Sequence, residues 1–141
     1  MKLDEHEALR RLDAADHGVL CTMHARRGAD AVPVAFAVDA DRTIGIPVDT
    51  VKPKASLRLQ REKNLIADPR ATLLVEQWDP DDWSQLWWVR VGLRHGAEAV
   101  DRPGDLADRL VAKYPQYHDR PFARILVLRI VEITGWAASP D

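Results

Sequence analysis

Short apolar runs separated by turn residues recur along this chain, and they constrain its fold more than any other feature. Two of the runs, 71–75 (ATLLV) and 124–128 (RILVL), are apolar at successive positions, which indicates strands that are covered on both faces. Clusters of Gly, Pro and Asp separate the runs, as expected for antiparallel strands joined by turns. We expect six strands, with a break or bulge around 92–96, at 19–23, 31–38, 43–48, 71–77, 86–100 and 124–134.

Three helices are expected around these strands. Apolar residues at helical spacing predict one at 3–15, a basic segment predicts one at 54–67 that Asp68-Pro69 stops, and Pro103 begins one at 103–114. These elements leave too few residues for a sandwich. The fold class is therefore mainly β, a six-stranded antiparallel split β-barrel, with barrel closure removing the exposed edges, in a single domain over 1–141. Packing of one barrel face on a second copy would explain the doubly apolar strands, so we expect a homodimer.

Composition excludes several classes of function. Twenty Lys and Arg stand against 22 Asp and Glu, a net charge of −2, which disfavours a general nucleic-acid-binding surface. No apolar run approaches the roughly 20 residues that span a bilayer, so no membrane partner is expected. The lone Cys21 is expected as a buried packing residue and fits a reducing cytoplasm. The five histidines are scattered without metal-ligand spacing, so no metal site is expected.

The basic segment 51–70 (VKPKASLRLQREKNLIADPR) has the character of an anion-binding site. On a helix that begins at residue 54, a turn of 100° per residue places three cations on one stripe beside Asn64 and turns Ala55, Leu59 and Ile66 towards the core. Cations that converge on one spot favour a phosphate, which accepts charge-assisted hydrogen bonds well. The alternative is a solvated basic face of an amphipathic helix. The three cations of the stripe are Lys54, Arg58 and Arg61.

Tryptophan is concentrated in one segment, because four of the five tryptophans lie within 78–88. In a strand that starts at Leu86, alternation sends Trp88 and Arg90 to one face and Trp87 and Val89 to the other. An outward indole either fills a dimer interface or forms an aromatic wall against a planar ring. The sequence leaves both interpretations open.

No catalytic constellation is recognisable in the sequence. The phosphate-loop motifs GxGxxG and GxxxxGK[ST] are absent, and so is the nucleophile motif GxSxG. The acidic residues Asp79, Asp81 and Asp82 are typical of a solvated turn and a helix cap. We therefore assign no catalytic residue, and an enzyme built from this chain would rely on a redox cofactor.

The order of these pieces resembles that of a known superfamily. It is similar to the flavin- and deazaflavin-dependent split-barrel oxidoreductases, which are the pyridoxamine 5′-phosphate oxidase-like proteins, over nearly the whole chain. Four further segments look like a branch that is usually assigned to coenzyme F420, a deazaflavin. The general resemblance rests on 18–22 (GVLCT), 32–39 (VPVAFAVD), 43–48, the basic helix, 68–75 (DPRATLLV) and 87–91 (WWVRV), and the branch on 52–54 (KPK), 82–90 (DWSQLWWVR), 114–117 (YPQY) and 135–138 (GWAA).

The resemblance implies a cofactor in a groove between two protomers and an unidentified small-molecule substrate. The flavin oxidase members place an arginine and a lysine on the second strand, where this chain has Val32 and Ala37, and the difference favours coenzyme F420 over FMN. Lys63, with Lys52 and Lys54, would face the anionic tail of F420. The implied contacts are the backbone of Pro33, Val34, Ala35, Ile46, Pro47 and Val48 with the ring, Arg61, Lys52, Lys54 and Arg58 with phosphate, and Asn64 as a polar contact.

Three functions are consistent with these observations. The first is an F420-dependent oxidoreductase that transfers hydride between the cofactor and a small organic acceptor. The second is an FMN-dependent or non-catalytic split barrel that binds a flavin or a tetrapyrrole. The third is a small barrel that binds single-stranded nucleic acid through Trp83, Trp87 and the basic helix, which the net negative charge disfavours.

Overall fold

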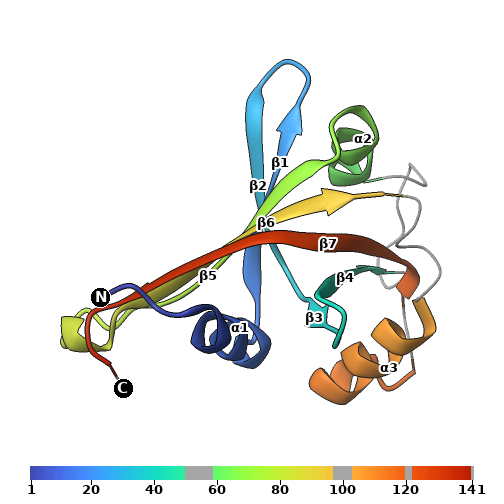
Figure 1. Cartoon of the computed structure of the whole chain (residues 1–141). Helices are drawn as coiled ribbons and strands as arrows, with labels where there is room; N and C mark the ends of the chain where they lie inside the picture. The colour runs from blue at the N-terminus through green and yellow to red at the C-terminus, as the bar shows by residue number, and fades with distance from the viewer. Residues whose placement is uncertain (50–58, 97–102, 120–121, 141) are drawn as a thin grey trace.

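The computed structural model describes residues 1–49, 59–96, 103–119 and 122–140 (Figure 1). The helices are α1 (Glu5–Ala14), α2 (Gln60–Ala67) and α3 (Pro103–Lys113), with the 3₁₀ turns η1 (Trp83–Gln85) and η3 (Pro115–Tyr117). The strands are β1 (Gly18–His24), β2 (Gly28–Val34), β3 (Ala37–Val38), β4 (Thr43–Asp49), β5 (Arg70–Gln77), β6 (Trp87–His95) and β7 (Phe122–Ala137). The mainly β class and the three helices are confirmed.

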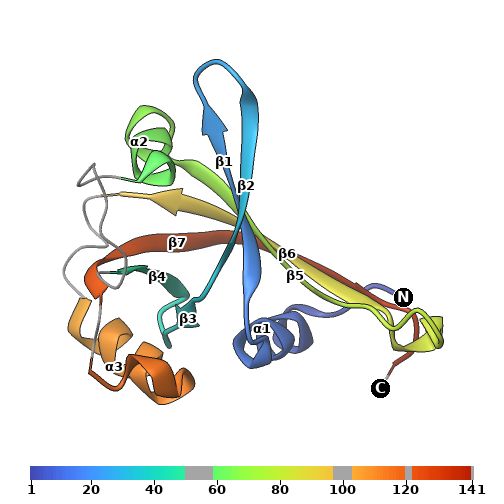
Figure 2. The same cartoon turned by 180° about the vertical axis from the view of Figure 1, so that it is seen from behind.

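The strands form one antiparallel sheet in the order β2-β1-β5-β6-β7-β4-β3. β2 and β3 are its two edges, yet only residues 35 and 36 separate them in the chain. The sheet must therefore curl until its edges approach each other, as the two opposite views show (Figures 1 and 2). The expectation of six strands and a closed barrel was wrong, because the strand expected at 31–38 breaks into β2 and β3 and its two parts lie on opposite edges of an open sheet.

The β1–β2 hairpin has a turn that its own residues stabilise. Gly28 adopts a φ of 89°, which a glycine allows without strain. The Nδ1 atom of His24 accepts hydrogen bonds from the backbone N–H groups of Arg26 and Arg27, at 3.0 and 3.1 Å. These contacts fix the register that pairs Thr22 with Asp30.

The irregularity expected in the long strand is also present. The pairing between β6 and β7 shifts its register between Gly92 and Leu93, which marks a β-bulge. The alternation expected for the tryptophan segment is confirmed: Val89 is fully buried, Trp87 packs against the core, and Arg90 lies over the ring of Trp88 at 5.2 Å. The strand itself is shorter than expected and ends at His95, while 97–100 lies outside the described residues.

The core lies inside the curl of the sheet, and α1 and α2 cover it. α1 begins at Asp4, whose carboxylate accepts a hydrogen bond from the N–H of Glu7 at 2.8 Å. Its buried face carries Ala8 and Leu12, which join the aliphatic side chains of the strands. The largest fully buried side chains are Phe36, Leu12, Leu20, Ile44, Ile46, Leu65, Leu73, Leu93, Leu106, Leu110, Leu128 and Val75.

α3 packs on the other face of the sheet, against β4. Gly45 is necessary for this contact, because a Cβ built there would lie 3.0 Å from Leu106 Cβ and 3.1 Å from Ile125 Cγ2. Within the described residues no helix is long and apolar enough to cross a bilayer, and no group of His, Cys, Asp and Glu is arranged to hold a metal ion.

Candidate functional site

α2, on which the sequence places the phosphate-binding residues, begins later than expected. The helix starts at Gln60 after the N-cap Leu59, whose N–H donates to Glu62 Oε1 at 3.0 Å, and it ends at Asp68 before Pro69. The expected start at Lys54 therefore has no support within the described part of the chain. Three of the predicted contacts, Lys52, Lys54 and Arg58, lie outside the described residues.

The face that α2 turns to the core also differs from the expectation. Ile66 is 62% exposed, whereas Leu65 is 1% exposed and belongs to the core. Leu59, which was expected on the same stripe, packs partly buried against the core. The eight-residue helix is positioned by the polar contacts of Glu62 and Asn64, and these contacts turn Leu65 rather than Ile66 to the core.

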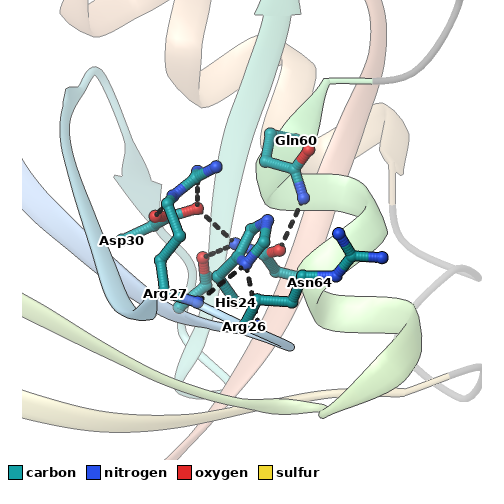
Figure 3. Close-up of polar contacts among 7 residues, drawn as sticks. His24, Arg26, Arg27, Asp30, Gln60 and Asn64 are labelled. Carbon is teal, nitrogen blue, oxygen red and sulfur yellow. Dashed lines mark hydrogen bonds and ion pairs between the residues drawn. The ribbon is translucent and has the colours of Figure 1, made fainter.

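Asn64 joins α2 to the β1–β2 hairpin (Figure 3). Its Nδ2 donates to Thr22 Oγ1 and to Asp30 Oδ2, both at 2.9 Å, and its Oδ1 accepts from Gln60 Nε2 at 2.9 Å. The hydrogen bond from Asn64, followed by the bonds from Arg27, lowers the pKa of the Asp30 carboxyl. Because Asn64 is only 3% exposed, its amide holds the protein together at the position where a contact to a cofactor was expected.

Glu62 joins α2 to the opposite part of the sheet. Its carboxylate accepts two hydrogen bonds from Arg124 on β7, from Nε at 2.7 Å and from Nη2 at 2.5 Å. Glu62 is 4% exposed, and the bond to it raises the pKa of Arg124. Arg124 pairs with Val48 in the ladder between β4 and β7. α2 therefore bridges the β1–β2 hairpin and the end of β4.

Two cations of α2 are neighbours of these attachments in the sequence, Arg61 before Glu62 and Lys63 between Glu62 and Asn64. Arg61 is half-buried and Lys63 is exposed, and each is next in the chain to a residue that anchors the helix. Through Glu62 and Arg124, α2 is attached beside Val48, one of the predicted ring contacts. The helix carries both cations in its first half, at the end where the backbone dipole is positive and favours an anion.

The two strand segments predicted to face the ring both lie at edges of the sheet. β2 is an edge strand, and β3 pairs with β4 only through Ala37–Gly45 and Val38–Ile44, so within the described residues no strand pairs with that side of 46–48. The side chains of Val34, Ile46 and Val48 are core residues, with exposures of 6%, 0% and 3%. These buried side chains leave the backbone as the part of Val34, Ile46 and Val48 that could meet a ligand, which is the mode of contact that the resemblance implies.

Among the described residues, Asn64 and the predicted ring contacts of β2 lie apart. Asn64 contacts Asp30, which lies four residues from Val34 along β2, a separation of about 13 Å in an extended strand. Ala37 pairs with Gly45, so 33–35 approaches 46–48 near this pairing, while Asn64 is attached at the hairpin end of β2. Such an arrangement suits an elongated ligand with a ring at one end and an anion at the other.

Solved structures of similar shape share one fold. An FAD-binding protein from Mesorhizobium loti superimposes with a TM-score of 0.68 at 15% identity, covering 96% of this chain and 95% of that one. A candidate pyridoxamine 5′-phosphate oxidase from Corynebacterium glutamicum gives 0.56 at 22% identity, with 96% and 94% covered. HutZ, the heme storage protein from Vibrio cholerae, gives 0.64 at 11% identity, with 92% of each chain covered. This chain has their split-barrel fold. No family model and no curated protein matches its sequence.

The split barrel owes its shape at 35–36 to residues that sequence reasoning missed. Phe36 N–H donates to Tyr114 Oη at 3.1 Å, and the Phe36 carbonyl accepts from Lys113 Nζ at 2.9 Å. Burial lowers the pKa of Lys113 to about 8 and raises the pKa of Tyr114. The segment 114–117 was noticed in the sequence only as part of a resemblance. Nothing in its pattern shows that it stabilises the connection between the two edges.

The tryptophans of the split barrel lie away from α2. Trp78 and Trp83 are 53% and 64% exposed, and their rings lie 5.4 Å apart at the tip of the β5–β6 connection. Asp79 and Asp82 form the turn and the cap expected of them, since they accept hydrogen bonds from the N–H groups of Asp81 and Ser84. α2 lies at the opposite end of β5 (Figure 1).

Proposed function

We propose that this split barrel is an oxidoreductase that binds a flavin-type cofactor, specifically the deazaflavin coenzyme F420, between two copies of the chain. The observation that carries the proposal is the placement of Arg61. It stands on a helix anchored both to the β1–β2 hairpin and to β7, and in the described part of the chain no strand pairs with the outer side of β2, whose backbone would contact a ring. The FAD-binding protein of the same fold supports a flavin-type ligand.

The donor set fits the two ends of such a cofactor. Arg61 and Lys63 would hold its phosphate and its anionic tail, and the backbone of 33–35 and 46–48 would contact the ring. The cofactor supplies hydride transfer. The protein orients the two reactants and excludes water from them. We assign no proton donor and leave the electron acceptor as a small organic molecule.

A titration of the purified chain with coenzyme F420 and with FMN tests the cofactor. We expect saturable binding of F420, seen as fluorescence change or retention on dialysis, and weaker binding of FMN. Consumption of reduced F420 with an enone or quinone acceptor would establish the reductase. Tighter binding of FMN than of F420 would overturn the deazaflavin assignment.

The substitution Arg61→Ala tests the phosphate site. It should weaken binding of F420 by about 1–3 kcal/mol, the scale of a lost charge-assisted hydrogen bond. Arg129→Ala is the matched control, because it removes an exposed arginine from the middle of β7. Unchanged affinity in a folded Arg61→Ala protein would contradict the assignment.

The second candidate is a non-catalytic carrier of a flavin or a tetrapyrrole. The heme storage protein of the same fold favours it. Heme added to the purified chain should then produce a stable absorption band and displace F420. Binding of F420 without turnover of any acceptor would favour the carrier over the reductase.

A further inference from the structure

Arg11 on α1 is a buried arginine whose guanidinium group is only partly used. The side chain is 6% exposed, and its Nε donates to Glu7 Oε1 at 2.9 Å. The same carboxylate also accepts from Arg10, at 2.8 Å from Nε, so one acid serves two arginines. Among the described residues, Nη1 and Nη2 of Arg11 have no hydrogen-bond partner. Neither nitrogen is among the described buried atoms that lack a partner, so both are open to solvent and to a ligand.

Arg11 lines a pocket of about 530 Å³, between the end of α1, the end of β5 and the start of β6. This volume lies within the range of small-molecule sites, about 300–1,000 Å³. The pocket is separate from the proposed cofactor site, because β5 starts three residues after α2 and its other end lines the pocket. An eight-residue strand spans about 23 Å, so the two sites lie at opposite ends of β5.

The aromatic wall of the pocket is held in place before any ligand binds. The guanidinium carbon of Arg11 lies 5.3 Å from the ring centroid of Trp87. Trp87 Nε1 donates to Gln77 Oε1 at 3.2 Å, and Gln77 Nε2 donates to the carbonyl of Gln85 at 3.3 Å. The cation and the indole plane are therefore both positioned by the protein, which reduces the entropy lost on binding.

The charges of the pocket select among anions. Glu7, Arg10 and Arg11 carry a net charge of one positive unit. Of the two arginines, Arg11 is the buried one. Asp16 and Glu76, which also line the pocket, are exposed, so their charges are screened by solvent but still oppose a dianion. The planar fork of a guanidinium matches a carboxylate.

From this geometry we propose that the pocket binds a small monocarboxylate, with its carboxylate on Nη1 and Nη2 of Arg11 and a flat apolar body against Trp87. The ligand is an effector or a substrate that occupies a site other than that of the cofactor. The proposal does not depend on which cofactor the split barrel takes, because no residue of α2 contributes to the pocket.

Titration of the full chain with sodium benzoate, followed by NMR, tests the proposal. The indole N–H of Trp87 reports on the pocket because it is hydrogen-bonded to Gln77. We expect saturable shifts of this signal and of the amides of residues 14–17, with a dissociation constant on the order of 1 mM or below. Acetate should bind more weakly because it lacks the ring, and phosphate more weakly because it carries a second charge.

Three variants separate binding from folding. Arg11→Met keeps the apolar length and should weaken benzoate binding at least about ten-fold, the scale of a lost charged hydrogen bond. Ala14→Trp fills the pocket from an exposed position and should abolish the shifts with Arg11 intact. Arg94→Met, at the far end of β6, is the matched control and should bind as the wild type does. Thermal unfolding establishes that each variant is folded.

The results that would overturn the proposal are distinct. Benzoate shifts that persist in a folded Ala14→Trp protein would place the ligand elsewhere. Tighter binding of phosphate than of benzoate would reject the monocarboxylate, and shifts reproduced by chloride at equal ionic strength would indicate screening only. The absence of a saturable shift with every probe would reject the site itself.

Discussion

Two polar side chains, Asn64 and Glu62, attach α2 to the sheet. Asn64 and Glu62 are nearly buried on a helix of eight residues, and each bonds to a different part of the sheet. Asn64 satisfies a buried threonine hydroxyl and a carboxylate at the same time. Removal of its amide takes this donor from the buried Thr22 hydroxyl and leaves the Asp30 carboxylate with only its bonds from Arg27, which is costly in a place that water reaches poorly.

Asn64→Ala should therefore lower the free energy of unfolding by about 2–3 kcal/mol. Urea denaturation followed by circular dichroism measures the change. Lys63→Ala is the control, since it changes an exposed neighbour and should stay within about 0.5 kcal/mol of the wild type. A loss below about 1 kcal/mol for Asn64→Ala would mean that the amide network contributes little to stability.

Glu7 predicts how stability depends on acid pH. Hydrogen bonds from Arg10 and then Arg11 lower its pKa from 4.5 to about 2. A depressed pKa in the folded state contributes stability that is fully present above pH 4.5 and is lost as the pH falls to about 2. The unfolding temperature should fall over this window, and Glu7→Gln should make the fall shallower. Parallel curves for the two proteins would refute this role of Glu7.

At the scale of elements, each helix attaches to the sheet in its own way. α2 uses buried polar contacts to both sides of the curl, whereas α3 packs on β4 through close van der Waals contact at Gly45. α3 also positions the polar side chains that hold the backbone at Phe36. The proximity of the two sheet edges thus depends on the docking of α3.

Gly45→Ala tests this docking. The added methyl group meets Leu106 and Ile125 at 3.0–3.1 Å, so we expect a loss of about 1–3 kcal/mol in the free energy of unfolding. Gly104→Ala is the matched control on α3, because nothing lies within 4 Å of the new atom. That change should raise stability by about 0.5 kcal/mol through a less flexible unfolded chain. Equal effects of the two substitutions would contradict the packing argument.

At the scale of the whole molecule, the outer face of the sheet suits a second copy of the chain. Val19, Leu74 and Pro33 lie side by side across three strands, and none of them belongs to the core. Leu73 and Val75 on either side of Leu74 are buried at 0% and 1%, so Leu74 points away from the curl. We propose this face as the interface of the homodimer.

Leu74→Arg should convert a dimer into a folded monomer, because a charge placed in a dry apolar contact weakens association by about 2 kcal/mol or more. Sedimentation velocity over a range of concentrations measures the change. Ile66→Arg, which introduces the same charge at an exposed position of α2, should leave the dimer intact. A wild-type chain that sediments as a monomer would refute the interface.

Much of the architecture could be predicted from local patterns. Alternation placed Val89 and Trp87 on one face and Arg90 beside Trp88 on the other, Pro69 ended α2, and the glycine turn gave the first hairpin. These features depend on neighbouring residues, so a single sequence contains them. The fold class followed from their order.

The sequence alone determined which segments are strands, where the chain turns and that cations gather before β5. Only the tertiary structure decided how these pieces meet. Three features depend on partners that lie far away in the chain. The break between β2 and β3 depends on Tyr114, the inward orientation of Asn64 on Asp30, and the position of the Arg11 guanidinium on Trp87. Such contacts form when the sheet curls, and no local pattern encodes the distance between two edges.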